Sequence, residues 1–487
     1  MAQNHFDLAA AARTKMLQEG FTPDFPAGTD QQLAQIAASA AQRIQIAPGI
    51  QDLRKLLWSS IDNETSRDLD QLEYAERVAG GIRVLIAIAD VDSAVTKGSP
   101  IDHHAADQTT SVYTPAKVFP MLPEELSTDL TSLNENEDRA AVVTEFVVDA
   151  NGEIQSPHIY RAVVNNKAQL AYPSVGAWLE QTAAAPPKVA ASADLQAQLK
   201  LQDQAAQLLR KQRIKCGALN FDRPESQALV APSGTVTHYG VEQRTRANDL
   251  IEDFMIAANE VMARTLQAAG RSSIRRVVKT PKRWDRIVTL AQEKGTRLPA
   301  DPDSAALNKF LEAQHDSDPI HYPDLSLAII KLMGPGEYVL LRAGEESQGH
   351  FGLAAIDYLH STAPNRRFSD VITQRLLKAL QKNSPSPYSD DELDAIAQNC
   401  TEKEDAARKV ERFTLKAAAA VALHNRIGQQ FNAVVTGASS KGTYARLLDP
   451  PIEGRVIRGA DGLDVGDETR VTLLGTNPQH AFIDLGR

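Results

Sequence analysis

Residues 60–71 read SIDNETSRDLDQ and place three aspartates, Asp62, Asp68 and Asp70, within nine residues. Carboxylates this close together repel one another unless a cation lies among them. Oxygen ligands at this spacing suit Mg²⁺ or Mn²⁺, which keeps several waters and takes a few carboxylates together with substrate phosphate. A solvated acidic loop is the alternative. The apolar run at residues 82–90 favours a functional site, because a loop held against a core strand often carries function.

Four further motifs follow in the sequence: MLPEELS at 121–127, IEDFMIAAN at 251–259, HFGL at 350–353 and TAPNRRFSD at 362–370. Together with residues 60–71 they resemble, in order and spacing, the ribonuclease II family, the RNB-type 3′→5′ exoribonucleases. The resemblance covers about residues 50–425. It implies a divalent-metal enzyme that hydrolyses RNA.

The resemblance departs at Gln71, where the family pattern has a fourth carboxylate. Two divalent cations about 4 Å apart serve phosphodiester hydrolysis. An amide oxygen coordinates without charge, so we expect two Mg²⁺ or Mn²⁺ ions, the second weakly held. Glu64 or Glu73 could instead supply the missing carboxylate.

Residues outside the acidic loop also take roles from the resemblance. Arg366 matches the active-site arginine, whose guanidinium stabilises transition-state charge. Tyr113 matches the tyrosine that packs on the terminal nucleotide. With Asp70, these are the expected catalytic residues. The expected metal ligands are Asp62, Asp68, Asp70 and Gln71.

A basic stretch at residues 271–286 includes Trp284 and suits phosphate neutralisation with base stacking, although a solvated helix face is the alternative. Glu252 and Asn259 are candidates for ribose contacts, since the 2′-OH distinguishes RNA from DNA, or for structural roles. Glu411 matches a family glutamate near the terminal nucleotide. The expected RNA-binding residues are Tyr113, Trp284, Glu252, Glu411, Arg366 and Tyr444.

At 487 residues the chain is too long for one compact core, so several domains are expected. Residues 1–48 carry helical apolar spacing and predict a small α-helical domain. It is either a helix-turn-helix or a pair of helices packed on the catalytic domain, in place of the two cold-shock barrels usual in the family. Residues 49–427 predict an α+β RNB catalytic domain, with helices near 192–213, 248–269 and 369–382.

Residues 428–487 form the third expected domain, a five-stranded OB-type β-barrel. The segment KGTYARL at 441–447, which contains Tyr444, resembles the RNA-binding OB fold first named from a ribosomal protein. Short strands separated by glycine turns are expected at 431–436, 443–448, 454–458, 468–474 and 481–485.

The net charge of −10 argues against indiscriminate nucleic-acid binding, but a channel that threads one strand needs only local positive charge. The two cysteines, Cys216 and Cys400, have no metal-type spacing. No apolar run is long enough to span a membrane, and no signal pattern is evident at the N-terminus. A cytoplasmic monomer without membrane contact is expected.

The sequence therefore favours a processive exoribonuclease that degrades single-stranded RNA from its 3′ end to nucleoside 5′-monophosphates. A metal-dependent nuclease acting on DNA is one alternative. Gln71 raises another, an RNA-binding protein with an impaired active site. The presence of Asp70, Tyr113 and Arg366 together argues against such decay.

Overall fold

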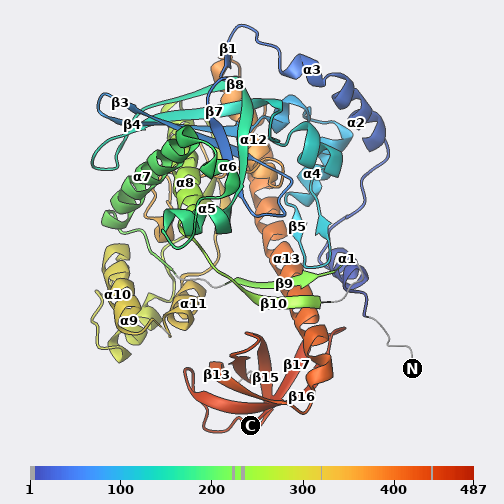
Figure 1. Cartoon of the computed structure of the whole chain (residues 1–487), viewed down its shortest axis with the longest axis vertical. Coiled ribbons are helices and arrows are strands. Elements are labelled where there is room, and N and C mark those ends of the chain that lie inside the picture. Colours follow the sequence, from blue (N-terminus) through green and yellow to red (C-terminus); the bar gives the residue numbers. More distant parts are fainter. Residues whose placement is uncertain (1–5, 222–224, 232–235, 320, 440–441) are drawn as a thin grey trace.

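The computed structural model describes residues 6–221, 225–231, 236–319, 321–439 and 442–487. Figure 1 shows a large central domain of sheet and helices above a small barrel that contains the C-terminus. The long helix α13 (Asp390–Leu423) runs from the central domain to the barrel. Ser389 and Glu392 form a capping box at its start, which satisfies backbone donors that a helix leaves free.

A six-stranded sheet organises the central domain, in the order β1-β8-β2-β3-β4-β7. The last strand, β8, pairs antiparallel with β7 and parallel with β1 and β2, so the sheet curls back on itself. Burial on both faces explains the continuous apolar run of β4. The strands are β1 (Ile50–Asp52), β2 (Trp58–Asp62), β3 (Gln71–Val78), β4 (Gly81–Ala89), β7 (Asp138–Val148) and β8 (Ile154–Ala171).

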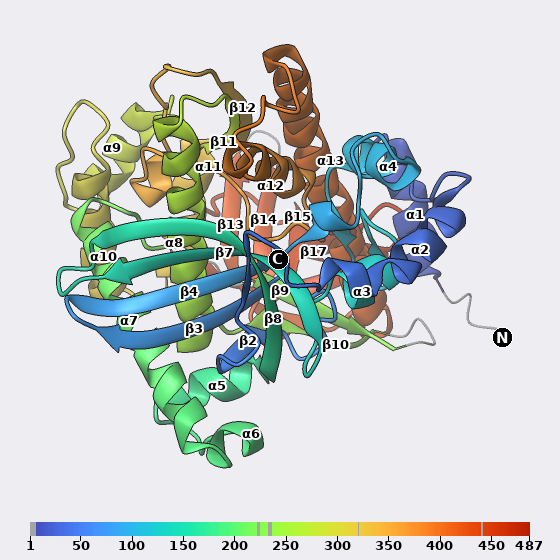
Figure 2. The same ribbon diagram turned by 90° about the horizontal axis from the view of Figure 1, so that it is seen from above.

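Helices α7 (Ala193–Lys215) and α8 (Arg246–Ala268) lie against this sheet, as Figure 2 shows from above. Ser192 caps α7 by accepting from the Leu195 backbone N–H, and a capping box begins α8. Helix α12 (Phe368–Gln381) packs on α8 and α13. The three helices expected in this domain are therefore present.

A helical insertion of the central domain has its own apolar core, built from α9 (Trp284–Glu293), α10 (Ser304–Ser317) and α11 (Tyr322–Met333). Trp284 belongs to that core. It is 4% exposed, and its indole Nε1 donates to the Pro299 carbonyl at 3.0 Å. A buried ring offers no face to a base, which corrects the expectation that Trp284 stacks on RNA.

The basic stretch around Trp284 is also divided by the fold. Arg275 and Arg276 lie in β11 (Ser273–Val277) and are buried. Arg276 pairs with Glu404 at 2.7 Å, and Arg275 lies 3.5 Å from Asp357. These two arginines hold strand β11 in place, so the stretch does not form one continuous phosphate-binding face.

The N-terminal helices α1 (Leu8–Gln18), α2 (Thr29–Ala38) and α3 (Ala40–Arg43) pack on the central domain, the second of the two expected arrangements. Ala12 and Met16 of α1 share a core with Val410 of α13. The Gln32 side chain of α2 donates to Ser99 Oγ at 2.8 Å, at the start of α4 (Pro100–Gln108).

Five strands close the C-terminal barrel in the order β13-β14-β15-β17-β16, which confirms the OB-type fold predicted from the sequence. Its core continues into α13 through Ala419, Ala420 and Leu423. None of the described helices is both long and apolar enough to cross a membrane. The strands are β13 (Gln430–Ser439), β14 (Gly442–Leu447), β15 (Glu453–Arg458), β16 (Glu468–Asn477) and β17 (Phe482–Gly486).

Candidate active site

The acidic loop connects two neighbouring strands of the central sheet. Asp62 ends β2 and Asp70 directly precedes β3, and these strands pair antiparallel through Ser59 and Glu73. The same register carried to the strand ends sets Asp62 across from Asp70. Leu69, which is 1% exposed, anchors the loop by accepting the Leu133 backbone N–H at 2.9 Å. The apolar residues of the motif thus fix where its carboxylates lie.

Asp70 is the most buried of the three aspartates, with 2% of its surface exposed. Its Oδ1 accepts the Asn365 backbone N–H at 3.0 Å, and its Oδ2 lies 3.7 Å from Arg366 Nε. The pKa of Asp70 is raised to about 8, chiefly by burial, with Arg366 opposing the shift and neighbouring Asp68 adding to it. A cation beside Asp70 would favour its ionised form.

Tyr113 connects the acidic loop to helix α13. Its hydroxyl donates to Asp68 Oδ2 at 2.7 Å, and its backbone N–H lies 3.4 Å from a carboxylate oxygen of Glu411. The side chain remains 39% exposed. The structure therefore brings Tyr113 and Glu411 to the aspartates, where sequence reasoning expected the terminal nucleotide.

Gln71 and Glu73, the expected fourth metal ligand and one of its two possible substitutes, are both buried beside the acidic loop. The Gln71 side chain is 8% exposed, and its Nε2 lies 3.5 Å from the Ile61 carbonyl. Glu73 is fully buried, and neither of its carboxylate oxygens has a hydrogen-bond partner within the described residues. Burial and nearby Asp62 raise the pKa of Glu73 well above its usual value. Glu64, the other alternative fourth carboxylate, is exposed.

The segment that carries Arg366 is held by its own backbone contacts. Asp370 accepts the Ala363 backbone N–H at 2.8 Å and pairs with Arg367 at 2.7 Å. The Ser111 N–H donates to the Arg366 carbonyl at 3.0 Å. Because these contacts fix the main chain, the Arg366 side chain, 49% exposed, is free to extend beside Asp70.

Sequence reasoning missed two residues of this segment, Asn365 and Asp370. Asn365 supplies the main-chain donor to Asp70, and its Oδ1 accepts from Thr131 Oγ1 at 2.6 Å. Both residues lie in the motif that identified Arg366, so their positions were visible. Their roles could not be predicted, because hydrogen bonds that involve main-chain N–H groups leave no pattern in the sequence.

The oxygen atoms of this site are of the kind that a divalent cation prefers. Across the described ranges, no three His, Cys, Asp or Glu side chains come close enough to form a metal cluster. The pair Asp68 and Asp70 fits one hard cation in donor type, since two carboxylates lie together and one is buried. Asp62 Oδ1 accepts from Asn63 N and Ser66 Oγ, at 2.7 and 2.8 Å. The metal assignment of Asp62, Asp68, Asp70 and Gln71 stays a prediction.

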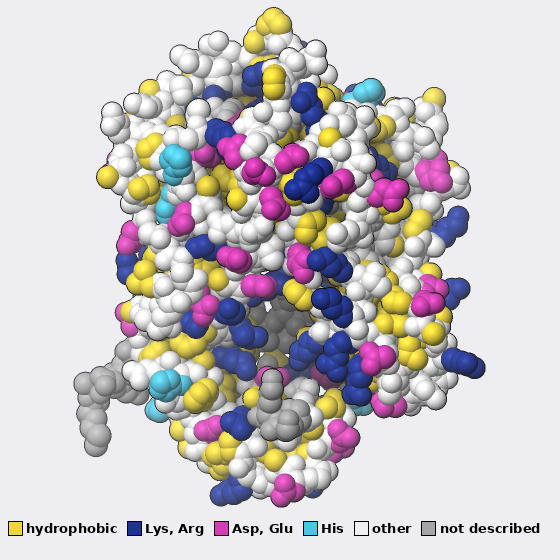
Figure 3. Space-filling view, turned by 180° about the vertical axis from the view of Figure 1, so that it is seen from behind, with side chains coloured by type: hydrophobic (Ala, Val, Ile, Leu, Met, Phe, Trp, Pro, Cys, Tyr) yellow, Lys and Arg dark blue, Asp and Glu magenta, His cyan; other side chains and the backbone are white. Residues whose placement is uncertain are grey.

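A cavity of about 480 Å³ lies between helix α8 and the insertion, and four arginines line it with Glu252 and His350. Figure 3 shows the molecule from behind, hollowed above the barrel and with Lys and Arg side chains gathered around the opening. Such local positive charge suits a single strand despite the negative total. The arginines are Arg210, Arg244, Arg276 and Arg408.

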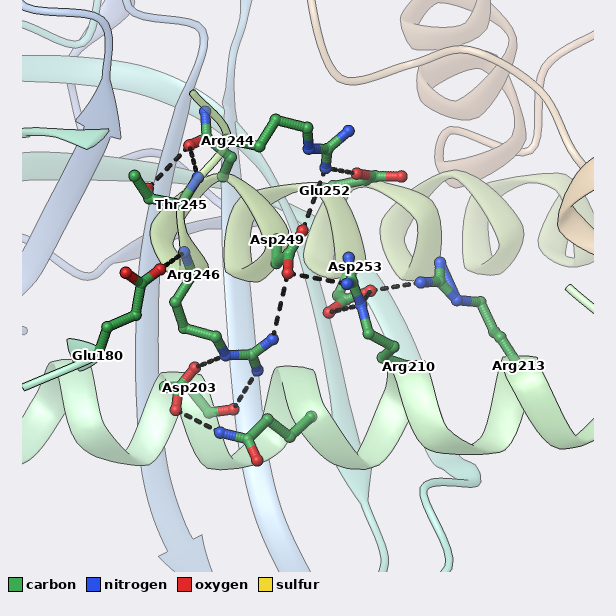
Figure 4. Close-up of polar contacts among 12 residues, drawn as sticks. Glu180, Asp203, Arg210, Arg213, Arg244, Thr245, Arg246, Asp249, Glu252 and Asp253 are labelled. Atoms are coloured by element: carbon green, nitrogen blue, oxygen red, sulfur yellow. Dashed lines mark hydrogen bonds and ion pairs between the residues drawn. The ribbon is translucent and has the colours of Figure 1, made fainter. Parts of the chain in front are cut away.

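An ion-pair network holds α7 and α8 beside this cavity, as Figure 4 shows. Asp253, fully buried, pairs with both Arg210 and Arg213, and Arg244 pairs with Glu252. Asn259 is buried as well. Its Oδ1 accepts the Ser361 backbone N–H at 2.9 Å, which supports the structural alternative for Asn259. Glu252, 40% exposed, stays a candidate for RNA contact.

The structure thus brings together Asp68, Asp70, Tyr113, Arg366 and Glu411 from four separate parts of the chain. Tyr444 lies apart from them, on β14 of the barrel.

A model of the RNB domain matches residues 50–383. The chain belongs to the RNB-domain family. Residues 429–487 match the model of the C-terminal S1 domain of RNase II-type exonucleases. The family resemblance drawn from the sequence motifs is confirmed.

Several curated relatives, all ribonuclease R proteins, are similar to this chain in sequence. Ribonuclease R of Escherichia coli strain K12 is 30% identical over 448 residues, which cover 89% of this RNB-domain chain and 54% of that protein. The chain spans 52% to 61% of the length of several such curated relatives.

Solved structures show the same fold. Ribonuclease R of Mycoplasma genitalium, in complex with ribose-methylated single-stranded RNA, gives a TM-score of 0.87 at 23% identity. The match covers 99% of this chain and 78% of that one. Yeast Ssd1, a pseudonuclease, gives a TM-score of 0.69 at 16% identity, covering 92% and 55% of the two chains. Because both an RNase and a pseudonuclease share the fold, activity must be argued from the site.

Proposed function

We propose that this protein is a processive hydrolytic 3′→5′ exoribonuclease that degrades single-stranded RNA to nucleoside 5′-monophosphates with divalent-metal catalysis. One observation carries the proposal: Tyr113 and Arg366, distant in sequence from the acidic loop and from each other, contact the neighbouring carboxylates Asp68 and Asp70. Ribonuclease R relatives and the M. genitalium complex with RNA support RNA as the substrate.

In this proposal Asp68 and Asp70 would hold the first Mg²⁺ or Mn²⁺ ion, with Asp62 contributing directly or through water, and Gln71 would be a ligand of a second, more weakly held ion. When bound, the ions supply a nucleophilic water and neutralise charge on the phosphate oxygens. Asp70 must be ionised to take this role. Because burial raises the pKa of Asp70, a bound cation would favour the ionised form that this role needs.

Arg366 acts on the phosphate itself. A guanidinium held close to the scissile phosphate stabilises the charge that develops in the transition state. The main-chain contacts of Asp370 and Ser111 fix the segment before substrate arrives, so little reorganisation is needed during the reaction.

Tyr113 and Glu411 lie where the 3′-terminal nucleotide would end. The Tyr113 hydroxyl is already oriented by Asp68, and its partly exposed ring offers a surface for the terminal base. Base stacking on an aromatic ring does not depend on sequence, which suits an enzyme that removes every nucleotide in turn.

The second candidate function is RNA binding without turnover. Gln71 favours it, because the amide lies against the Ile61 carbonyl and adds no charge to the metal ligands. The pseudonuclease Ssd1 has the same fold. The joint presence of Arg366, Tyr113 and Asp70 supports the enzyme over this alternative.

Digestion of end-labelled RNA tests the proposal. With Mg²⁺ and unstructured RNA, a 3′ label should appear at once as a mononucleotide. A 5′ label should remain in full-length RNA until it appears in one short end product, without a ladder of intermediates. Internal cleavage products would contradict exonuclease action, equal digestion of DNA would contradict RNA specificity, and binding without products would support the second candidate.

A further inference from the structure

Residues 131–133 lie between the helical turn Leu126–Leu130 and strand β7, and all three side chains are buried. Each of the three residues makes a hydrogen bond to a part of the active site that lies far away in the sequence. We call residues 131–133 the clamp. None of them is among the residues expected to bind a metal ion or RNA.

Ser132 holds the main chain beside Asp68. Its Oγ accepts the Leu69 N–H at 3.0 Å. Its hydroxyl hydrogen has two acceptors within reach, the Arg67 carbonyl at 2.8 Å and Asn134 Oδ1 at 2.9 Å. Because Ser132 is 0% exposed, water does not replace these bonds when they are lost. The fully buried hydroxyl thus fixes the backbone from which the Asp68 side chain extends.

Leu133 and Thr131 hold Asp70 from two directions. The Leu133 N–H donates to the Leu69 carbonyl at 2.9 Å, directly before Asp70. On the other side, Thr131 Oγ1 donates to Asn365 Oδ1 at 2.6 Å, the shorter of two contacts that this hydroxyl makes. The Asn365 main-chain N–H in turn donates to Asp70 Oδ1 at 3.0 Å.

The clamp is itself tied to the central sheet. The Asn166 side-chain amide of β8 donates to the Leu133 carbonyl and to Ser60 Oγ of β2, both at 3.0 Å. Arg139 Nε of β7 donates to the Ser132 carbonyl at 2.9 Å. Three strands therefore fix the clamp, so it can act as a reference for the groups that it holds.

We infer that the clamp is a positioning device for the reaction: it sets the separation of Asp68 and Asp70 from Arg366. Asp70 Oδ2 lies 3.7 Å from Arg366 Nε, and the residue that Thr131 binds directly precedes Arg366. Thr131 and Ser132 are positioning residues, because they act through these three side chains. The inference rests on the proposed function.

A positioning role differs from a purely structural one in what it predicts. Fixed charges lower a reaction barrier only at the right distances, and a misplacement of about 1 Å can lower the rate about 10²-fold. Loss of a clamp bond removes no group that contacts RNA. Turnover should therefore fall while RNA affinity is retained, whereas a structural role alone predicts that both fall with stability.

Two substitutions of Thr131 give the first test. Thr131→Val removes the hydroxyl and keeps the shape, and it should lower single-turnover hydrolysis of a short unstructured RNA about tenfold. Thr131→Ser keeps the hydroxyl and should restore the rate to within about twofold of the parent. RNA affinity, measured with Asp70→Asn added so that the RNA survives, should stay within about twofold.

Thr373→Val is the matched control. Thr373 of α12 is also buried, and its hydroxyl likewise has two acceptors, the His360 and Ser369 carbonyls. This variant should also lose stability, since it too loses a buried donor, but it should hydrolyse RNA at the parent rate. Melting temperatures of all variants ensure that rates are compared where every protein is folded.

Ser132→Ala should have the larger effect. It leaves the Leu69 N–H without its acceptor next to Asp68, so hydrolysis should fall about 10²-fold while RNA affinity stays near that of the parent.

Hydrogen exchange of the Asn365 main-chain N–H gives a readout that does not depend on activity. Thr131 contacts only the side chain of Asn365, whereas the N–H donates to Asp70. Exchange in peptides that contain Asn365 should be faster in Thr131→Val and unchanged in Thr131→Ser and Thr373→Val.

Parent-like hydrolysis by both Thr131→Val and Ser132→Ala would overturn the inference. A loss of rate in Thr373→Val as large as in Thr131→Val would also overturn it, as would a loss of RNA affinity that matches the loss of rate. Failure of the proposed function is distinguishable, because it appears as no mononucleotide release by the parent. In that case exchange decides: faster exchange in Thr131→Val alone supports the clamp, and unchanged exchange contradicts it.

Discussion

The active-site loop and the C-terminal barrel arrange their functional side chains in opposite ways. Asp70 is almost fully buried and held by a main-chain N–H, whereas Phe482 is 61% exposed and its ring lies beside that of His480. Chemistry at a phosphate needs fixed charges, while holding a strand of any sequence needs accessible surface. The comparison predicts that changes in the loop alter turnover and changes on the barrel surface alter affinity.

The largest expected effect is in the loop. Asp70→Asn should lower the rate of RNA hydrolysis by at least about 10³-fold, because an amide cannot supply the charge that holds the cation. RNA affinity should stay within about twofold of the parent, since no phosphate contact is removed. Single-turnover digestion and binding on the same preparation check both. A rate within tenfold of the parent would show that Asp70 is not central.

The adjacent residues Arg366 and Arg367 are expected to differ, the first acting in turnover and the second in stability. Arg366→Ala should lower kcat by about 10²-fold with little change in stability, because the side chain is half exposed and its role lies in the transition state. Arg366→Lys should recover only part of the loss, since an ammonium lacks the planar fork.

Arg367→Ala is the matched control. Arg367 pairs with buried Asp370, so its loss should mainly lower the melting temperature by leaving that carboxylate unpaired. If Arg366→Ala destabilised the protein as much as Arg367→Ala, Arg366 would be a structural residue.

Much of the fold could be predicted from the sequence because its signals are local. Short strands separated by glycine turns predicted the barrel, and the helices expected near residues 192–213 and 248–269 are present as α7 and α8. The aspartates were identified because their spacing is itself unfavourable without a cation.

The failures have long-range causes. Trp284 was expected at an RNA surface, but residues such as Phe310 and Ile329, far along the chain, enclose it in a separate core. The buried pairing of Arg276 with Glu404 likewise depends on α13.

A smaller effect is expected from restoring the family's fourth carboxylate. Gln71→Asp should lower the metal concentration for half-maximal activity several-fold, because hard cations respond to ligand charge. The rate at saturating metal should change little. Metal titrations of both proteins with one RNA at one salt concentration decide it. An unchanged or higher requirement would mean that position 71 does not face the cations.

The smallest expected effect concerns the pH dependence of stability that the buried side chain of His350 produces. Burial lowers the pKa of His350 to about 4, and its Nδ1 accepts the Leu353 N–H at 3.1 Å. An unfolded histidine has a pKa of about 6.5, so the unfolded state binds the extra proton between about pH 6.5 and 4. The unfolding free energy should therefore fall as pH drops through this window.

His350→Gln should make that fall shallower, because it removes the buried group that takes up a proton only on unfolding. Denaturant unfolding at several pH values between 4 and 7 measures the slopes. Equal slopes in His350→Gln and the parent would contradict the assignment.

The most direct test of the central claim measures two quantities on two variants: hydrolysis of a short RNA and affinity for a long one. The account predicts that Asp70→Asn loses hydrolysis and keeps affinity for the long RNA. It predicts that the double variant Phe482→Ala with His480→Ala, with Asp70 intact, cleaves short RNA at the parent rate. With Asp70→Asn added so that the RNA survives, the same double change should bind long RNA about tenfold more weakly, as expected for one lost stacking partner. Loss of both properties together in either variant would contradict a buried catalytic loop that acts separately from an exposed strand-binding barrel.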